Sequence, residues 1–167
     1  HQERGFLPWE QLVAPAIKLA REGIPITYSL QSGFLRNKSR FDLYPSSQQK
    51  FFKADGSSYE LDELWVQEDL AHTLELIQKN GRDGFYKGEN ARRLADFMAA
   101  NGGIITEEDL ELYQPVEREP VRGTYRGYEI VSMPPPTSGG VALMQMVNIP
   151  EGFYVGALGH SSPAFLH

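Results

Sequence analysis

The sequence predicts a helix-rich α/β chain of the α+β kind, with few strands. Apolar residues recur at three- and four-residue spacing over much of its length, as they do on one face of a helix. Gly and Pro residues separate these periodic segments at short intervals. Strand-like composition is concentrated in one stretch near residues 120–133, which predicts a short β-hairpin. The 167 residues suffice for one domain with its own core but not for two large ones.

The first predicted helix spans residues 8–23. Gly23 is a suitable stop, and Pro25 prevents the helix from continuing. Pro15 removes an interior hydrogen bond, so we expect either a bend there or a helix that begins after Trp9. The apolar face expected from the spacing consists of Leu12, Val13, Ala16, Leu19 and Ala20.

The next region predicts short helices and a loop. Residues 26–52 are polar with scattered aromatic side chains, and we expect two short helices there, separated by a loop around Pro45. Residues 53–64 contain the turn signal Asp55-Gly56 and predict a longer loop.

Two strongly periodic helices should follow. Residues 64–81 predict an amphipathic helix that ends at Asn80-Gly81, with Val66, Leu70, Leu74 and Ile77 on its apolar face. After an aromatic turn interrupted by glycines, a second helix should end at Gly102-Gly103. Its apolar face consists of Ala91, Leu94, Ala95 and Met98. Thr106 and Asp109 resemble a capping box, with Asp in place of the usual Glu, and should start a short helix.

The last third predicts the hairpin, with a tight connection at Arg126-Gly127, and then a buried helix over residues 139–149. Between them stands Pro-Pro-Pro-Thr-Ser-Gly-Gly, residues 134–140. This segment can be a boundary, in which Thr137 or Ser138 caps the helix and the glycines let it pack closely. It can also be a site, because free amides at a helix N-terminus attract anions. Residues 162–167 look like the first turn of a further helix.

Composition excludes several classes of function. The net charge is −6 and the 16 Lys and Arg residues are scattered, which argues against nucleic-acid binding. The absence of Cys excludes disulfides, a thiol nucleophile and Cys-based metal sites. No apolar run approaches the length needed to span a membrane. No leader sequence is visible from His1 onward, although what precedes His1 is unknown.

Few polar residues stand out as candidates for chemistry. His72 is expected at the surface and His160 in a loop or cap, because no histidine has a metal-ligand spacing. The acidic run at residues 107–109 suits a helix N-terminus, and Arg92-Arg93 suits a solvated face. Nucleophile-elbow, phosphate-loop and dinucleotide-binding motifs are absent. We therefore expect no metal and no cofactor in this chain.

Four blocks of the sequence, taken in order, resemble the large subunit of γ-glutamyltranspeptidases, also called γ-glutamyltransferases or glutathione hydrolases. The blocks are residues 7–23, 81–97, 101–149 and 151–167. The similarity runs in order over essentially the whole chain, and four blocks in order are far more specific than any one of them.

The resemblance implies the α/β/β/α fold of N-terminal nucleophile hydrolases, of which this chain would be a helix-rich fragment. The family is made as a precursor that cuts itself and exposes a threonine at the start of a small subunit. That threonine is the nucleophile, and its own α-amine is the base. The γ-glutamyl group of a small-molecule donor such as glutathione passes to water or to an amino acid or peptide. Family members are usually exported, which implies a periplasmic or secreted location.

The catalytic threonine of the family has no counterpart in this chain. A Thr-His pair marks the processing site, and none of the chain's threonines (Thr27, Thr73, Thr106, Thr124 and Thr137) precedes a histidine. The family's core segment and carboxylate-binding arginine are expected upstream of His1, and the small subunit downstream of His167. We therefore expect residues 1–167 to be a single partial domain whose partners are the other segments of the same precursor. No catalytic or substrate-binding residue is assigned here.

Three further expectations follow. Pro150 stands where the family usually has an aliphatic residue, so the last helix should end early. The parent enzyme could instead be a related amide hydrolase, such as a cephalosporin or glutaryl acylase or a poly-γ-glutamate capsule enzyme. A helical interaction module without chemistry is the remaining alternative, and it should lack the large exposed apolar surface of a fragment.

Overall fold

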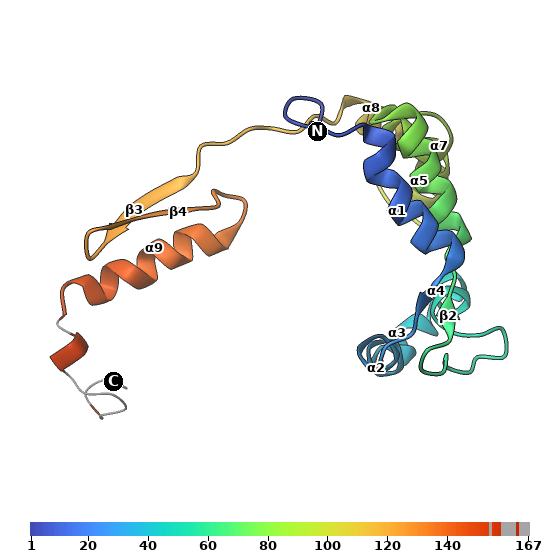
Figure 1. Cartoon of the computed structure of the whole chain (residues 1–167), viewed down its shortest axis with the longest axis horizontal. Coiled ribbons are helices and arrows are strands. Elements are labelled where there is room, and N and C mark those ends of the chain that lie inside the picture. Colours follow the sequence, from blue (N-terminus) through green and yellow to red (C-terminus); the bar gives the residue numbers. More distant parts are fainter. Residues whose placement is uncertain (154, 158–162, 164–167) are drawn as a thin grey trace. The chain divides into compact units, whose positions relative to one another are not determined.

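The computed structural model describes residues 1–153, 155–157 and 163, and the chain divides into two compact units (Figure 1). Unit 1 is His1–Tyr113 and unit 2 is Gln114–His167. Unit 1 contains α1 (Trp9–Glu22), β1 (Ile24–Pro25), α2 (Tyr28–Arg36), α3 (Lys38–Phe41), α4 (Pro45–Phe51), β2 (Leu64–Trp65), α5 (Glu68–Asn80), α6 (Asp83–Tyr86), α7 (Gly88–Ala100) and α8 (Glu107–Leu112). The described part of unit 2 contains β3 (Val121–Tyr125), β4 (Tyr128–Ser132), α9 (Ser138–Glu151) and a 3-10 turn (Val155–Ala157).

The described residues are thus mostly helical, with two antiparallel two-stranded sheets, β1–β2 and β3–β4. This arrangement confirms the predicted helix-rich class with few strands. The expectation of a single partial domain concerns a longer protein and stays a prediction.

Helices α1 and α5 are the main packed pair of unit 1 and run antiparallel. The indole N–H of Trp9, at the start of α1, donates to the carbonyl oxygen of Ile77 near the end of α5 at 2.9 Å. At the opposite end of the pair, the backbone N–H of Gln67 donates to the carbonyl oxygen of Ala20 at 2.8 Å. Backbone groups at both ends therefore fix the register of the two helices.

Helix α1 differs from the prediction in two respects. It begins at Trp9 and contains Pro15, so the later start, one of the two alternatives expected at Pro15, is wrong. Its buried residues are Val13, Ile17 and Ala20. Leu12 and Leu19 are 46% and 56% exposed, and Ala16 is exposed too, so three of the five residues of the expected apolar face point away from unit 1's interior. The spacing of three and four residues fits both stripes, and only the position of α5 selects one.

A compact aromatic core lies among the elements between α1 and α5. Its members, each less than a tenth exposed, are Ile26, Phe34, Phe52 and Trp65. The Trp65 ring meets Phe34 edge-on at a centroid distance of 5.1 Å, and its indole N–H donates to the carbonyl oxygen of Lys50 at 3.0 Å. Such edge-on packing with a satisfied indole N–H is favourable for buried aromatic side chains.

Three helices, rather than the two predicted, surround this core. Pro45 does not lie in the loop but is the first residue of α4, where its missing N–H costs no hydrogen bond. The loop expected at residues 53–64 is present up to the start of β2. The β1–β2 pair, with Ile24 opposite Trp65, was not predicted. Helix α5 starts only at Glu68, so Val66 lies outside it, contrary to the prediction.

The remaining helices of unit 1 follow the prediction closely. In α7, Ala91 is buried and Leu94, Ala95 and Met98 are half-buried, which confirms the expected face. The capping box at the start of α8 is also confirmed. The Asp109 N–H donates to the Thr106 hydroxyl at 3.1 Å, and the Thr106 N–H donates to the Asp109 carboxylate at 2.9 Å.

Unit 2 is a hairpin with one helix packed on it (Figure 1). β3 and β4 pair from Val121 opposite Ser132 to Tyr125 opposite Tyr128. The connecting residues Arg126 and Gly127 have φ values of 49° and 83°, as a two-residue hairpin turn of the primed kind requires. The predicted hairpin and its connection are therefore confirmed.

Helix α9 starts one residue before the predicted position and ends two residues after it. Pro150 lies inside its last turn, and the helix continues to Glu151, so the expected early end is wrong. Near the end of a helix an interior Pro removes a single hydrogen bond, and the turn can tolerate that loss. The helix expected at residues 162–167 lies outside the described residues, apart from Pro163.

Candidate functional site

The segment between β4 and α9 is the feature that the sequence singled out most strongly. Gly140 is buried, and a Cβ atom on it would collide with the carbonyl oxygen of Met133. A Cβ on Gly139 would have its nearest neighbour at 3.9 Å, on Thr137. Gly140 therefore lets the first turn of α9 pack against the end of the hairpin, which supports the boundary interpretation.

The predicted side-chain cap of α9 is absent. Thr137 occupies the cap position with extended backbone angles, but its side chain makes no capping hydrogen bond, and Ser138 is already the first helical residue. The backbone N–H of Thr137 donates to the carbonyl oxygen of Pro134 at 3.3 Å. The turn is thus held by its backbone rather than by the hydroxyl groups that the sequence suggested.

The candidate histidines and arginines are distributed over the surface. His72 is at the surface as predicted, with 45% of its side chain exposed, and its Nε2 lies 3.0 Å from the Glu89 carboxylate. Arg93 reaches the same carboxylate at 3.6 Å and is 61% exposed. Arg92 is also exposed, so the prediction of a solvated face is confirmed. His160 and His167 lie outside the described residues.

The acidic run at the start of α8 serves the helix rather than a cation. Hydrogen bonds from the hydroxyl and backbone N–H of Thr106 lower the pKa of the Asp109 carboxyl below its usual value. The negative charge lies at the helix N-terminus, where the backbone amides favour it. Among the described residues, no three His, Asp or Glu side chains gather in a way that could hold a metal ion.

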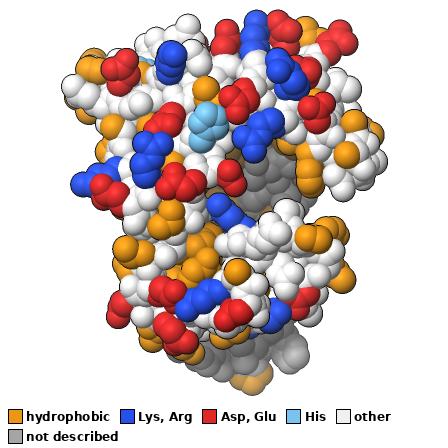
Figure 2. Space-filling view, turned by 90° about the vertical axis from the view of Figure 1, so that its right-hand side faces the viewer, with side chains coloured by type: hydrophobic (Ala, Val, Ile, Leu, Met, Phe, Trp, Pro, Cys, Tyr) orange, Lys and Arg blue, Asp and Glu red, His pale blue; other side chains and the backbone are white. Residues whose placement is uncertain are grey.

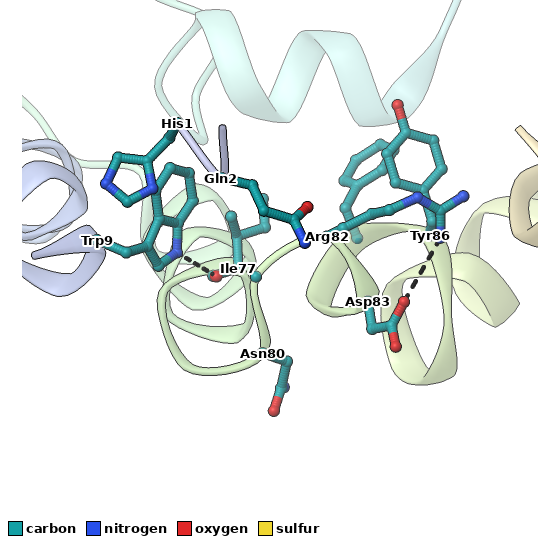
Figure 3. A pocket seen from close by; sticks show the side chains of 10 residues that line it. His1, Gln2, Trp9, Ile77, Asn80, Arg82, Asp83 and Tyr86 are labelled. Carbon is teal, nitrogen blue, oxygen red and sulfur yellow. Dashed lines mark hydrogen bonds and ion pairs between the residues drawn. The ribbon is translucent and has the colours of Figure 1, made fainter. Parts of the chain in front are cut away.

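A hollow of about 990 Å³ lies beside α5 and α6 (Figure 3). Trp9, Asn80, Arg82, Asp83 and Tyr86 are among the residues that line it. It is open and mixes aromatic and charged side chains. Its walls include His1 and Gln2, the first residues of the chain.

Arg82, on the wall of this hollow, is fully engaged by its own unit. One of its terminal nitrogens donates to the carbonyl oxygens of Glu111, at 3.0 Å, and of Tyr113. Its other terminal nitrogen lies 3.5 Å from the Asp83 carboxylate. The guanidinium also lies over the Tyr86 ring, 4.8 Å from its centroid. The sequence analysis did not identify Arg82, because its partners are distant backbone carbonyls that leave no motif.

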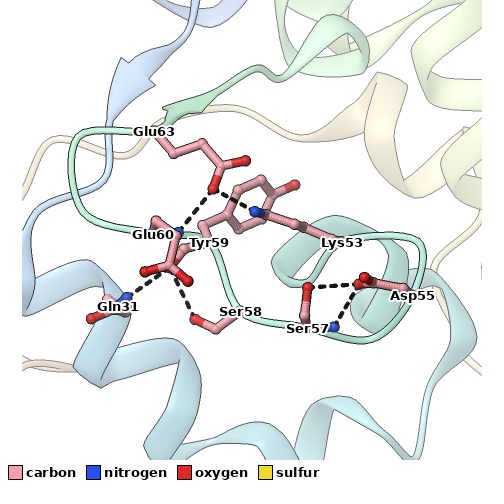
Figure 4. Close-up of polar contacts among 8 residues, drawn as sticks. All are labelled: Gln31, Lys53, Asp55, Ser57, Ser58, Tyr59, Glu60 and Glu63. Atoms are coloured by element: carbon pink, nitrogen blue, oxygen red, sulfur yellow. Dashed lines mark hydrogen bonds and ion pairs between the residues drawn. The ribbon is translucent and has the colours of Figure 1, made fainter.

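A second polar cluster shapes the loop between α4 and β2 (Figure 4). The Lys53 ammonium lies 2.7 Å from the Glu63 carboxylate, which also accepts from the backbone N–H of Glu60 at 2.8 Å. The hydrogen bond between Lys53 and Glu63 lowers the pKa of the Glu63 carboxyl and raises the pKa of the Lys53 ammonium. Asp55 accepts from the hydroxyl and the N–H of Ser57, which lowers the pKa of Asp55. These local bonds close the turn.

Figure 2 shows acidic and basic side chains intermixed, with apolar side chains between them, over the face that it draws. Within the described part of the chain, no helix combines the length and the apolar character needed to cross a membrane.

Comparison with known proteins finds similarity over the whole chain. The γ-glutamyltranspeptidase family model matches residues 1–167. The chain is 40% identical over 158 residues to the glutathione hydrolase proenzyme of Escherichia coli K12, covering 95% of this chain and 27% of the relative. It is 40% identical over 163 residues to the acylase ACY 1 proenzyme of Pseudomonas sp. strain SE83, covering 98% of this chain and 29% of the relative.

A solved structure agrees with these matches. The γ-glutamyltranspeptidase of Helicobacter pylori superposes with a TM-score of 0.93 at 42% identity, covering 99% of this chain and 48% of that one. This agreement confirms the expected fold class, a fragment of the N-terminal nucleophile hydrolase fold. The chain spans 27–29% of the length of these two curated relatives.

Proposed function

This chain belongs to the γ-glutamyltranspeptidase family, and we propose that it is a large-subunit segment of an enzyme that cleaves γ-glutamyl amides such as glutathione. The enzyme passes the γ-glutamyl group to water or to an amino acid or peptide. The observation that supports the proposal is the family match over residues 1–167, together with the TM-score of 0.93 at 42% identity. Because the match includes every part of the chain, it favours the interpretation that the chain is a segment of such an enzyme. An unrelated module that shared one motif would match over that motif only.

In this proposal the chemistry belongs to a threonine outside this chain, at the start of the small subunit. Its hydroxyl oxygen attacks the γ-carbonyl carbon while its own α-amine takes the hydroxyl proton. The amide nitrogen leaves with a proton, and the resulting γ-glutamyl ester is cleaved by water or by an acceptor amine. The segment described here contributes scaffold to that reaction. A periplasmic or secreted location belongs to the same proposal.

A related amide hydrolase is the second candidate. The similarity to the acylase ACY 1 proenzyme is as high, at 40% identity, and covers slightly more of this chain, at 98%. Residues common to both kinds of enzyme cannot decide between them, because substrate choice depends on pocket residues that contact the acyl group. This chain has no assigned pocket residue.

The test uses the complete precursor that contains this segment. It is purified, its self-cleavage is followed by gel electrophoresis, and it is supplied separately with γ-glutamyl-p-nitroanilide, glutathione and a glutaryl amide. We expect self-cleavage and turnover of the two γ-glutamyl donors, with little turnover of the glutaryl amide. A precursor with alanine in place of the newly exposed threonine is the control and should do neither. Self-cleavage with turnover of the glutaryl amide alone would instead establish the acylase.

A further inference from the structure

At the end of helix α8, the backbone N–H of the cap residue Tyr113 donates to the carbonyl oxygens of Asp109 and Leu110, and the carbonyl groups that follow need other donors. The helix has six residues and carries no basic residue in its last turn. The final carbonyl oxygens of a helix have no partner inside it and need donors from elsewhere. Here the donor comes from the neighbouring helix region, because Arg82 donates to the carbonyl oxygens of Glu111 and Tyr113. Arg82 therefore caps α8 from 29 and 31 residues away in sequence.

Arg82 is itself held in place from two sides (Figure 3). Its guanidinium lies over the ring of Tyr86 at 4.8 Å, which favours a cation on that face. Tyr86 in turn stacks on Tyr113, with centroids 5.3 Å apart and an angle of 11° between the ring planes. Tyr113 is thus held twice, by Arg82 at its carbonyl oxygen and by Tyr86 at its ring.

A separate ion pair joins the same two regions. The Lys87 ammonium lies 2.9 Å from the Glu111 carboxylate. Both groups are exposed, so the pair alone contributes little. Together with the Arg82 contacts, however, it gives α8 several points of attachment to the α6–α7 junction.

The attachment lies at the end of unit 1, where the chain continues toward unit 2. Tyr113 is the last residue of unit 1, and the exposed residues 114–119 that follow form no helix or strand before unit 2 begins its hairpin. We propose that Arg82 is the anchor that fixes the point at which the chain leaves unit 1. The anchor acts on the last turn of α8 and the start of the connection, and it depends on the fork of the guanidinium.

Arginine suits this task better than lysine. Its planar fork presents several N–H donors in fixed directions, so that one side chain can serve two carbonyl oxygens and a carboxylate while its flat face rests on a ring. A lysine ammonium keeps the charge but has neither the planar face nor the paired donors. Arg82→Lys should therefore restore only part of the anchoring.

The test is hydrogen–deuterium exchange, read by mass spectrometry, on the complete precursor with Arg82→Gln, Arg82→Lys or no change. Arg82→Gln should speed exchange of the amides of residues 110–116 by about tenfold, as local opening becomes more frequent. Peptides from α1 and α5 should keep their exchange rates. Trypsin should also cut faster at Arg118, which is exposed in the connection. The Lys variant should lie between the other two.

Arg93→Gln is the matched control, because it removes an exposed arginine whose nearest partner is a single carboxylate at 3.6 Å. It should leave the exchange of residues 110–116 unchanged. The proposal is overturned if Arg82→Gln leaves that exchange unchanged, or if it speeds exchange equally in α1 and α5. If Arg82→Gln does not fold, Arg82→Lys decides by the same comparison. The contacts that support the anchor lie within this chain, so its failure would not affect the proposed function.

Discussion

The two units of the chain differ in how completely each buries its apolar side chains. Unit 1 has an aromatic core in which Phe52 and Ile26 are 1% and 0% exposed. Of the described residues of unit 2, Gly140 and Met144 alone are buried. Met146 and Ile149, on the same helix as Met144, are 68% and 69% exposed. Unit 1 thus has an interior of its own, whereas α9 covers one face with the hairpin and leaves the others open.

The difference shows which part of the chain depends on the rest of a longer protein. A helix that is apolar all round belongs inside a structure, and a two-stranded hairpin is marginal by itself. Since the chain spans only 27–29% of two curated relatives, segments that could cover α9 would lie elsewhere in the parent. We therefore expect unit 2 to depend on the rest of the precursor more than unit 1 does, although unit 1 also exposes large apolar side chains such as Phe6 and Ile104.

The largest effect should come from separating the two units. Residues 1–113, produced alone, should unfold cooperatively in urea, because their core and helix pairs are internal. Residues 114–167, produced alone, should show little stable structure or should self-associate and bind a hydrophobic dye. Circular dichroism and dye fluorescence measure both outcomes. A cooperative, dye-free fold of residues 114–167 would contradict the comparison.

The next largest effect should come from the aromatic core of unit 1. Phe52→Ala removes a side chain that is 1% exposed and should lower the free energy of unfolding of residues 1–113 by about 3–5 kcal/mol. Phe97→Ala is the control, because Phe97 is 57% exposed, and it should change that free energy by less than about 1 kcal/mol. Urea titration gives both values, and equal losses for the two variants would exclude the proposed core.

Two neighbouring glycines test the packing of unit 2. Gly140→Ala places a Cβ against the carbonyl oxygen of Met133 and should destabilise the precursor by about 1–3 kcal/mol. Gly139→Ala has room for its Cβ and should be neutral or stabilising by about 0.5–1 kcal/mol, because alanine favours helix. Both changes in stability are measured as shifts of the melting temperature, in the precursor that carries alanine in place of the catalytic threonine. Similar melting temperatures for the two variants would argue against close packing at Gly140.

The smallest effect concerns the capping box of α8. Because Thr106 lowers the pKa of Asp109 in the folded state, the box stabilises α8 fully above the ordinary value of 3.8. That stabilisation is lost as the pH falls through the lowered pKa. Thr106→Ala should move the Asp109 pKa back up toward 3.8, as an NMR titration of residues 1–113 would detect. Thr124→Ala, on the hairpin, should have no such effect when the full chain is titrated.

The sequence predicted those features correctly that depend only on residues close to one another in the chain. The Thr106–Asp109 box, the Arg126-Gly127 turn and the face of α7 all depend on residues within a few positions of one another. The β1–β2 pair escaped prediction because each strand has two residues, too few for any periodicity. The α1 face was wrong in part because only α5 decides which apolar stripe is buried.

The candidate site shows the same limit. Sequence reasoning correctly treated His72 and Arg92 as surface residues, since nothing near them formed a motif. It could not find Arg82, because that side chain binds backbone carbonyls from a region 29 and 31 residues away. It also suggested Thr137 or Ser138 as a side-chain cap, where backbone bonds and the missing Cβ of Gly140 organise the turn instead.

The dependence of unit 2 on the rest of the parent is tested most directly by hydrogen–deuterium exchange of α9, residues 138–151, in two samples. One is the 167-residue chain and the other is the complete precursor. We predict that the α9 amides exchange much faster in the isolated chain than in the precursor, while the amides of α1, α5 and α7 exchange at similar rates in both. Equal protection of α9 in the two samples would contradict this account, because the helix would then need nothing beyond its own hairpin.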